Sequence, residues 1–421
     1  MVNKTKMLGL GATLMLLVSA GASLTSCGGT NYDLTYWCPG TDNAVMEEIV
    51  ADFKTAYPDY ASKSIGLSGN YGEGETFAQL DKDVSAAADV IAMVDDNIRA
   101  AVKAQDLQAL SAEDKAAAIA SDGAAAVSAL TIDDTMYGYP YRNDNSPEVF
   151  YDKTVFTDAT KLNRLEDMLA VCKAAGKKLY LNLTDSWYTP FILWAGGATF
   201  KVDSDGLIET DAAKGKLTAC TAAAEACYSL FGEYKGTWVS DNTQASVESG
   251  FKDGSIAVSF LWNDLTNIKA GNANVAVAPW PSMSIGGVDT PLCCFQSYKS
   301  FVVKAGISDT SRLTLAETFA KFCCGEAAQL RRVKELSYGA SNLKVQATAE
   351  AAALPFSSAI SKMTLAGLTR PQATSTTSSF WNPVKAFGTH IANQDSWGAN
   401  ASAKVTIKSM VSNTGWKSVD F

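Results

Sequence analysis

The chain has 421 residues, with 35 Lys and Arg against 44 Asp and Glu and a single histidine, which gives a formal net charge of −9. This acidic balance argues against nucleic acid or an anionic membrane face as the ligand. One histidine, His390, is too few for a histidine-rich metal site, and we interpret it as a structural or solvated residue. We expect neither a metal nor a cofactor.

The N-terminus reads as a targeting segment. Two lysines precede an uncharged, mostly apolar run at residues 7–23, which is short for a bilayer span. The next residues, 24–27 ("LTSC"), resemble the lipobox of bacterial lipoproteins, in which cleavage falls before the cysteine and the thiol receives lipid. We therefore expect residues 1–26 to be a signal peptide and Cys27 to be the lipid attachment site. The alternative is an N-terminal membrane anchor with an incidental cysteine.

The remaining 395 residues are too many for one ordinary hydrophobic core and suit two lobes. Along them, short apolar strands alternate with amphipathic helices. In chain order we expect a strand at 33–37, a helix at 45–57, strands at 89–94, 178–183, 255–262 and 274–278, and a helix at 313–324. This alternation predicts an α/β protein with largely parallel sheets.

Eight cysteines follow Cys27, and no C-x-x-C spacing occurs among them. Neither a zinc site nor a disulfide framework is indicated, so we interpret them as small buried hydrophobes. A disulfide between the adjacent pairs Cys293–Cys294 and Cys323–Cys324 stays open, because sequence cannot decide it.

Six segments in a fixed order carry a resemblance to a known family. They are "TYWCPG", "ADVIAMVDDNIRAAVKAQDLQAL", "YGYPYRNDNSPEVFYDK", "LYLNLTDSWYTPFILWAGGATFKV", "ESGFKDGSIAVSFLWND" and "RPQATSTTSSFW". Together they resemble the maltodextrin-type extracellular solute-binding proteins of ABC transporters. The resemblance departs at Met93, where the sugar-binding relatives often have a tryptophan, and at Asn97, where they have a basic residue. These departures leave the identity of the ligand open.

The resemblance implies a two-lobed, periplasmic-binding-protein-like α/β fold with a ligand cleft at the hinge. Lobe I would hold residues 31–142 and 285–336, and lobe II would hold residues 143–284 and 337–421. The chain would cross between the lobes near 141–149, near 277–284 and soon after residue 336.

A sugar site needs flat aromatic surfaces and fixed hydrogen-bonding groups, and open α/β sheets bind ligands beyond the carboxyl ends of their strands. Tryptophans and aspartates at such positions, most of them also implied by the resemblance, give our candidate ligand-binding residues: Trp37, Asp42, Asp96, Asp185, Trp187, Trp262 and Trp381. Asp95 is a secondary candidate. The alternatives are packing for the tryptophans and helix capping or solvation for the aspartates. Arg142 either pairs with an acid or binds an anionic sugar group.

The resemblance implies a non-catalytic, monomeric receptor that is lipid-anchored on the outer face of the cell membrane. It would bind an oligosaccharide such as a maltodextrin and deliver it to an ABC-type permease, whose ATPase subunit it meets only indirectly. The alternatives are a lipid-anchored glycoside hydrolase, which needs two carboxylates about 5–10 Å apart, and a surface adhesin.

Overall fold

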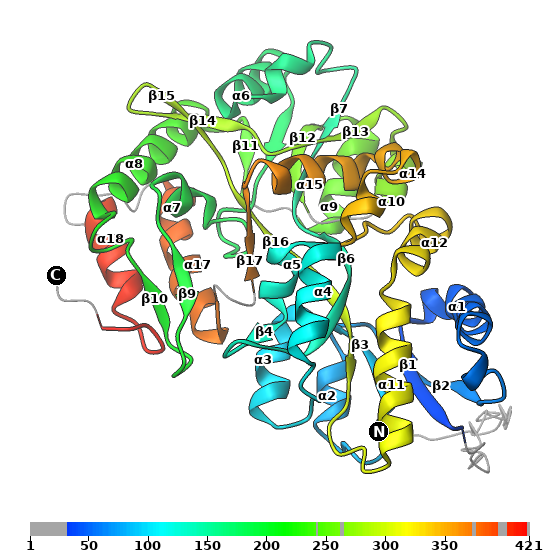
Figure 1. Ribbon diagram of the computed structural model, residues 1–421. Coiled ribbons are helices and arrows are strands. Elements are labelled where there is room, and N and C mark those ends of the chain that lie inside the picture. The colour runs from blue at the N-terminus through cyan, green and yellow to red at the C-terminus, as the bar shows by residue number, and fades with distance from the viewer. Residues whose placement is uncertain (1–31, 241–242, 262–264, 373–375, 395–401, 419–421) are drawn as a thin grey trace, which may run out of the picture.

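The computed structural model describes residues 32–240, 243–261, 265–372, 376–394 and 402–418. It consists of two lobes, each a sheet covered by helices, and the chain passes repeatedly from one to the other (Figure 1). The predicted two-lobed α/β fold is confirmed. Cys27 and Trp262 lie outside the described residues. None of the helices in the described ranges is long and apolar enough to cross a membrane.

Lobe I is built on a six-stranded sheet in the order β17-β16-β3-β1-β2, with β6 also paired to β16. Strands β1, β2 and β3 run parallel, whereas β16 runs antiparallel to β3 and β6. Strand β3 is buried along its whole length, as expected for a strand covered on both faces. The strands are β1 (Leu34–Cys38), β2 (Ile65–Asn70), β3 (Val90–Val94), β6 (Gly138–Asn145), β16 (Cys294–Val303) and β17 (Thr369–Pro371).

Helices cover this sheet because their apolar residues recur on one face. In α1 these residues are Val45, Met46, Ile49 and Phe53, all buried. The helices of this lobe are α1 (Asn43–Ala56), α2 (Thr76–Leu80), α3 (Asp95–Lys103), α4 (Ala112–Asp122), α5 (Ala124–Ala129), α11 (Thr310–Cys323), α12 (Glu326–Leu336), α13 (Leu343–Gln346) and α14 (Ala349–Ala353), with 3-10 turns η1 (Gly40–Asp42) and η2 (Pro58–Tyr60). A small hairpin adds β4 (Thr131–Ile132) and β5 (Thr135–Met136).

Lobe II is built on a five-stranded sheet in the order β11-β8-β12-β7-β13. Its strands are β7 (Glu148–Asp152), β8 (Lys178–Tyr180), β11 (Trp238–Val239), β12 (Ile256–Leu261) and β13 (Val275–Ala278). Its helical elements are η3 (Ala159–Leu162), α6 (Leu165–Ala174), α7 (Phe191–Ala195), α8 (Leu217–Glu233), α9 (Gln244–Asp253), α10 (Leu265–Gly271), α15 (Pro355–Leu365), α17 (Ser378–Asn393) and α18 (Ala403–Val411). Two hairpins, β9 (Phe200–Val202) with β10 (Ile208–Thr210) and β14 (Ser282–Ile285) with β15 (Val288–Pro291), extend from it.

The crossings between the lobes are short. Strand β6 of lobe I ends at Asn145, and β7 of lobe II begins at Glu148. The indole Nε1 of Trp280 donates to the carbonyl of Pro147 at 2.7 Å and so ties this crossing to lobe II. The β14–β15 hairpin contacts α6 and α8, and β16 then enters the sheet of lobe I. The predicted divisions at residues 142, 285 and 336 stay predictions. This packing favours a crossing near Cys294, and beyond residue 336 the elements α13, α14 and β17 still pack with lobe I.

All eight cysteines in the described part of the chain are free and buried. The Cys294 thiol lies 3.2 Å from the hydroxyl of Ser146, whereas the Cys324 thiol donates to the carbonyl of Tyr139 in lobe I at 3.1 Å. The two adjacent pairs belong to the cores of different lobes, so no disulfide joins them here. Burial raises the pKa of Cys172 and of Cys323 to about 12, consistent with inert, buried thiols.

Candidate ligand-binding site

Two of the predicted tryptophans meet on one buried phenylalanine. Phe295 lies near the start of β16 and is fully buried. Trp187 stacks on it, with ring centroids 5.1 Å apart and 23° between planes, and Trp381 meets its edge at 6.0 Å. Both tryptophans are only partly buried, so each presents part of its ring outward. The result is a partly exposed aromatic surface of the kind that binds the apolar face of a sugar.

A polar depression adjoins this surface. It is lined by Asn182, Thr184, Asp185, Ser186, Trp381 and Lys385. The segment leaves the carboxyl end of β8, and its turn is fixed by its own side chains. Asp185 Oδ1 accepts from the amide of Trp187 at 2.9 Å, and Asn182 Oδ1 accepts from the amide of Thr184 at 3.0 Å. Predicted residues Asp185, Trp187 and Trp381 are therefore brought together.

Asp96 lies at the first turn of α3, in lobe I, and is exposed. Its Oδ2 accepts from Nε2 of Gln372, at 3.3 Å, on the segment that leads from β17 to Trp381. Although the residue as a whole is exposed, protein atoms near its carboxylate partly desolvate that group, and this raises the pKa of Asp96 above its ordinary value. The contact places Asp96 beside Gln372, at the end of β17 and nine residues before Trp381 in the sequence.

The adjacent carboxylate, Asp95, is fully buried, and its hydrogen-bond partners lie on β16. It accepts a hydrogen bond from the hydroxyl of Ser297 and a second one, at 3.0 Å, from the amide of Tyr298. Burial raises its pKa to about 8. These contacts join the start of α3 to β16.

Trp37 and Asp42 are both buried in lobe I. Trp37 is 6% exposed and packs edge-on against Tyr71, with centroids 4.9 Å apart. Asp42 is fully buried; its Oδ1 accepts from the Tyr338 hydroxyl at 2.8 Å, and its Oδ2 lies 3.8 Å from Arg332 Nε. A ligand contact for either residue stays a prediction, as it does for Trp262 at the end of β12.

Arg142, whose role the sequence left open, is engaged by acids within lobe I. Its guanidinium lies 3.2 Å from Glu73 and 3.1 Å from Asp144, and it stacks over the Tyr338 ring. The nearby carboxylates hold its pKa above the ordinary value against the cost of burial. His390 is partly buried on α17, and its Nδ1 has no hydrogen-bond partner among the described residues.

Sequence reasoning missed Phe295, Gln372 and Lys385. Phe295 lies in an apolar stretch that reads as ordinary core, and only its neighbours in space give it a place in the site. Gln372 lies nine residues before Trp381 in the sequence, and Lys385 lies four residues after it. Their polar side chains, so near a predicted aromatic contact, could have indicated that they belong to the candidate site.

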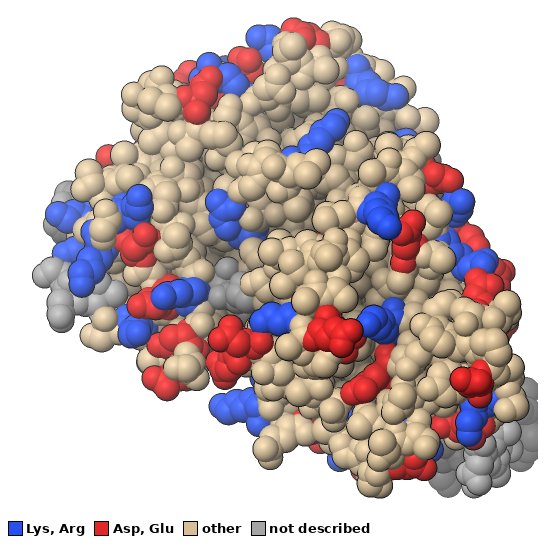
Figure 2. Space-filling view, in the orientation of Figure 1, with Lys and Arg blue, Asp and Glu red and all other residues tan. Residues whose placement is uncertain are grey.

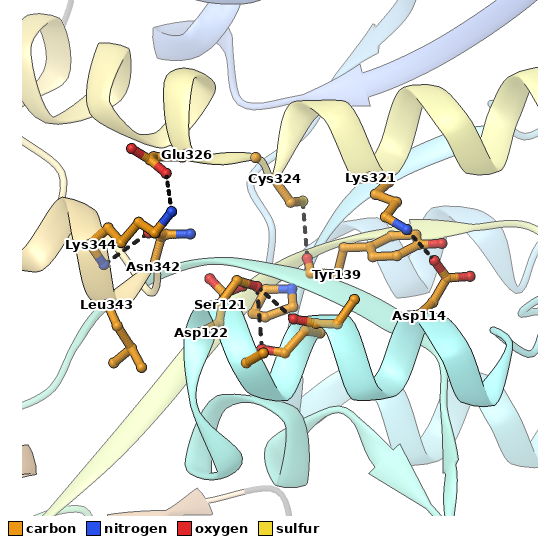
Figure 3. Close-up of a pocket in the computed structure, with 15 residues that line it drawn as sticks. Asp114, Ser121, Asp122, Tyr139, Lys321, Cys324, Glu326, Asn342, Leu343 and Lys344 are labelled. Carbon is orange, nitrogen blue, oxygen red and sulfur yellow. Dashed lines mark hydrogen bonds and ion pairs between the residues drawn. The ribbon is translucent and has the colours of Figure 1, made fainter.

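A separate depression in lobe I, of about 260 Å³, lies between α4, α12 and α13 (Figure 3). Four of its charged side chains form ion pairs, Lys321 with Asp114 at 2.7 Å and Lys344 with Glu326 at 3.3 Å, and Asp122 accepts from Gln329 and Ser341. None of the predicted site residues that the structure describes lines it. Because these groups already have partners, this depression is a weaker candidate than the aromatic surface.

Comparison with known proteins agrees with this architecture. Residues 48–356 match the family model described as bacterial extracellular solute-binding protein. No curated protein matches the sequence. Among solved structures, the fold is similar to maltodextrin-binding protein MalE1 from L. casei BL23 without ligand, with a TM-score of 0.75 and 20% identity over 90% of this chain and 98% of that chain.

Two further solved structures hold a ligand. One is a cyclo/maltodextrin-binding protein complexed with maltotetraose, with a TM-score of 0.73 and 18% identity over 91% of this chain and 97% of that chain. The other is MalX from Streptococcus pneumoniae in complex with maltopentaose, with a TM-score of 0.67 and 19% identity over 90% of this chain and 98% of that chain. At these identities the likeness concerns the fold, whereas the family model covers well over half of the sequence. The chain belongs to the family of bacterial extracellular solute-binding proteins.

Proposed function

We propose that this protein is a non-catalytic receptor for an oligosaccharide, with a maltodextrin as the first ligand to test. The observation that carries the proposal is the pair of partly exposed tryptophans, Trp187 and Trp381, held on Phe295 beside the carboxylate of Asp185. Aromatic faces bind the C–H surfaces of a sugar, and carboxylates accept strong hydrogen bonds from its hydroxyls. The solved structures of similar fold that hold maltotetraose and maltopentaose support this choice.

The receptor would act by hinge closure. A ligand that touches both lobes favours the closed arrangement by the difference between its affinities for the closed and open forms. Asp96 in lobe I and the Trp187 surface in lobe II are the groups we assign to the two sides, together with Trp262. The closed form would be presented to an ABC-type permease, and a lipid on Cys27 would keep the receptor at the outer face of the membrane.

Isothermal titration calorimetry with linear maltodextrins, followed by chromatography of the recovered sugar, tests the proposal. A receptor binds and returns the sugar unchanged. Release of shorter sugars would favour the glycoside hydrolase, with Asp96 and Asp185 as its candidate carboxylates. If neither binding nor cleavage occurs with any member of the series, the maltodextrin assignment is wrong.

A further inference from the structure

A third depression, of about 490 Å³, lies between the lobes where the β9–β10 hairpin of lobe II approaches α3 and the β4–β5 hairpin of lobe I (Figure 1). The charged side chains of its lining are Arg99, Lys115, Asp133 and Asp134 from lobe I and Lys201 and Asp203 from lobe II. Acidic and basic side chains gather along this border of the two lobes (Figure 2). Among the described residues, no aromatic side chain lines the depression, in contrast to the surface around Trp187.

Arg99 is the unusual group in this depression. It is partly buried, its Nε is inaccessible to solvent, and no hydrogen bond or ion pair joins it to any other residue that the structure describes. Desolvation lowers its pKa, although Asp133 and Asp203 oppose that effect from a distance. The partly buried Arg142, by comparison, pairs with two acids. A guanidinium that pairs with no acid keeps the donors that face the depression available for a ligand.

The depression also offers acceptors. Asp133 and Asp134 form the tip of the β4–β5 hairpin in the left-handed region, with φ of 47° and 65°, and both are exposed. Asp203 Oδ1 already accepts from the amides of Asp205 and Leu207 in its own turn. Lys115 and Lys201 also border the depression, so its basic side chains are as many as its acidic ones and it favours neither an anion nor a cation. A neutral group with many hydroxyls fits best, because each hydroxyl both donates and accepts.

The depression continues the proposed site. Asp96 and Arg99 are three residues apart on α3, so they share one face of the helix and are separated by about 4.5 Å along its axis. Asp96 accepts from Gln372 at the end of β17, and Arg99 lines the depression one turn further along. A ligand chain that passes Asp96 would therefore reach Arg99 next.

We infer that this depression is an outer saccharide subsite, in which Arg99 donates to the hydroxyls of a sugar unit beyond those held at the tryptophans. The inference rests on the proposed function and adds to it a preference for longer oligosaccharides. Short ligands would fill the aromatic surface alone, whereas longer ones would also reach the charged depression between the hairpins.

The test is calorimetric titration of linear maltodextrins of two to seven glucose units into wild type, Arg99→Ala and a matched control. Lys103→Ala is that control, because it removes one positive charge from an exposed position on the same helix outside the depression. Arg99→Ala should weaken binding of the longest ligands roughly tenfold while changing that of the shortest less than about twofold. Lys103→Ala should follow wild type at every length.

Three outcomes would overturn the subsite while leaving the receptor function intact. One is an Arg99→Ala loss that is equal at every length, which would indicate a contact that favours lobe closure instead. The others are no loss at any length and a wild-type protein whose affinity does not rise with length. A wild-type protein that binds no member of the series would overturn the proposed maltodextrin ligand as well. Melting temperatures of the unliganded variants check that each is folded.

Discussion

Trp187 stacks on Phe295, with 5.1 Å between ring centroids and 23° between planes, and so links the loop after β8 to the strand that crosses between the lobes. Phe295 is fully buried and also meets Trp194 edge-on at 4.8 Å. The indole of Trp187 therefore rests on a fixed surface while part of it stays exposed. A rigid aromatic side chain loses little conformational entropy when a ligand binds, so this arrangement is preorganised.

Trp187→Ala and Trp381→Ala should each weaken maltodextrin binding by about 1–3 kcal/mol, as aromatic residues at the centre of interfaces do. The unliganded protein should lose only about 1 kcal/mol of stability, because each ring is partly exposed and has only one aromatic contact, for Trp187, or two, for Trp381, inside the described part of the protein. Calorimetric titration and urea unfolding measure the two effects.

Trp416→Ala is the control for these variants. Trp416 is buried, stacks on Phe380 at 5.8 Å and lies outside the polar depression. It should lose about 3–5 kcal/mol of stability, as expected for a core aromatic, and little affinity in the folded fraction. The site assignment would be wrong if Trp187→Ala showed this same pattern.

Asp95 should make stability depend on pH. Because burial raises its pKa to about 8, the folded protein holds a proton that the unfolded chain releases above about pH 4. The contribution of Asp95 to the free energy of unfolding is therefore present at low pH and is lost as the pH rises towards 8. The free energy of unfolding should fall by up to about 1.4 kcal/mol per pH unit in this range.

Urea unfolding between pH 5 and 8, with wild type compared with Asp95→Asn, measures this contribution. The amide keeps an oxygen that can accept from Tyr298, so the variant should lose less stability than wild type as the pH rises. Burial also raises the pKa of Glu148, which gives both proteins the same additional slope. Parallel curves for the two proteins would contradict the prediction.

The ion pairs of Arg142 should contribute strongly to stability. Arg142→Met leaves Asp144 without its cation and Glu73 with only Lys299, at 3.4 Å, all at low exposure. Removal of one partner from such a buried cluster costs about 3–5 kcal/mol. Lys63→Met, which breaks an exposed pair with Asp33, should cost less than about 1 kcal/mol in the same unfolding experiment. Equal losses would show that burial does not matter here.

Ligand binding should compact the molecule by rotation of rigid lobes about the crossings. The radius of gyration from small-angle scattering should fall when the sugar saturates the protein, while far-UV circular dichroism stays constant. Each lobe has its own core and should remain intact during the rotation. A scattering profile unchanged by a saturating ligand would argue against closure and favour the adhesin.

Cys27 should be the lipidated N-terminal residue of the mature protein. Mass spectrometry of membrane-extracted protein should find a chain that begins at Cys27 with an acyl modification, and Cys27→Ser should release processed protein from the membrane. An unmodified, secreted chain that begins at another residue would contradict this.

The sequence alone was sufficient for the fold class, and it also proposed several residues of the candidate site. The predicted strands at 89–94 and 274–278 correspond to β3 and β13, and the predicted helix at 313–324 corresponds to α11, within a few residues at each end. These elements could be predicted because each depends on the local period of its apolar residues. Asp185 and Trp187 could be found for a related reason, since both follow closely on a strand end.

Tertiary structure alone decided which of these groups share a surface. Phe295 reads as ordinary core, yet packing against Trp187 and Trp381 makes it the base of the candidate site. Asp42 reads as a loop carboxylate, yet Tyr338 and Arg332, distant in sequence, bury it. The charged depression around Arg99 arises only where hairpins of different lobes approach each other. Burial and pairing depend on residues brought together by the whole fold, whereas periodicity is already present in a few adjacent turns of chain.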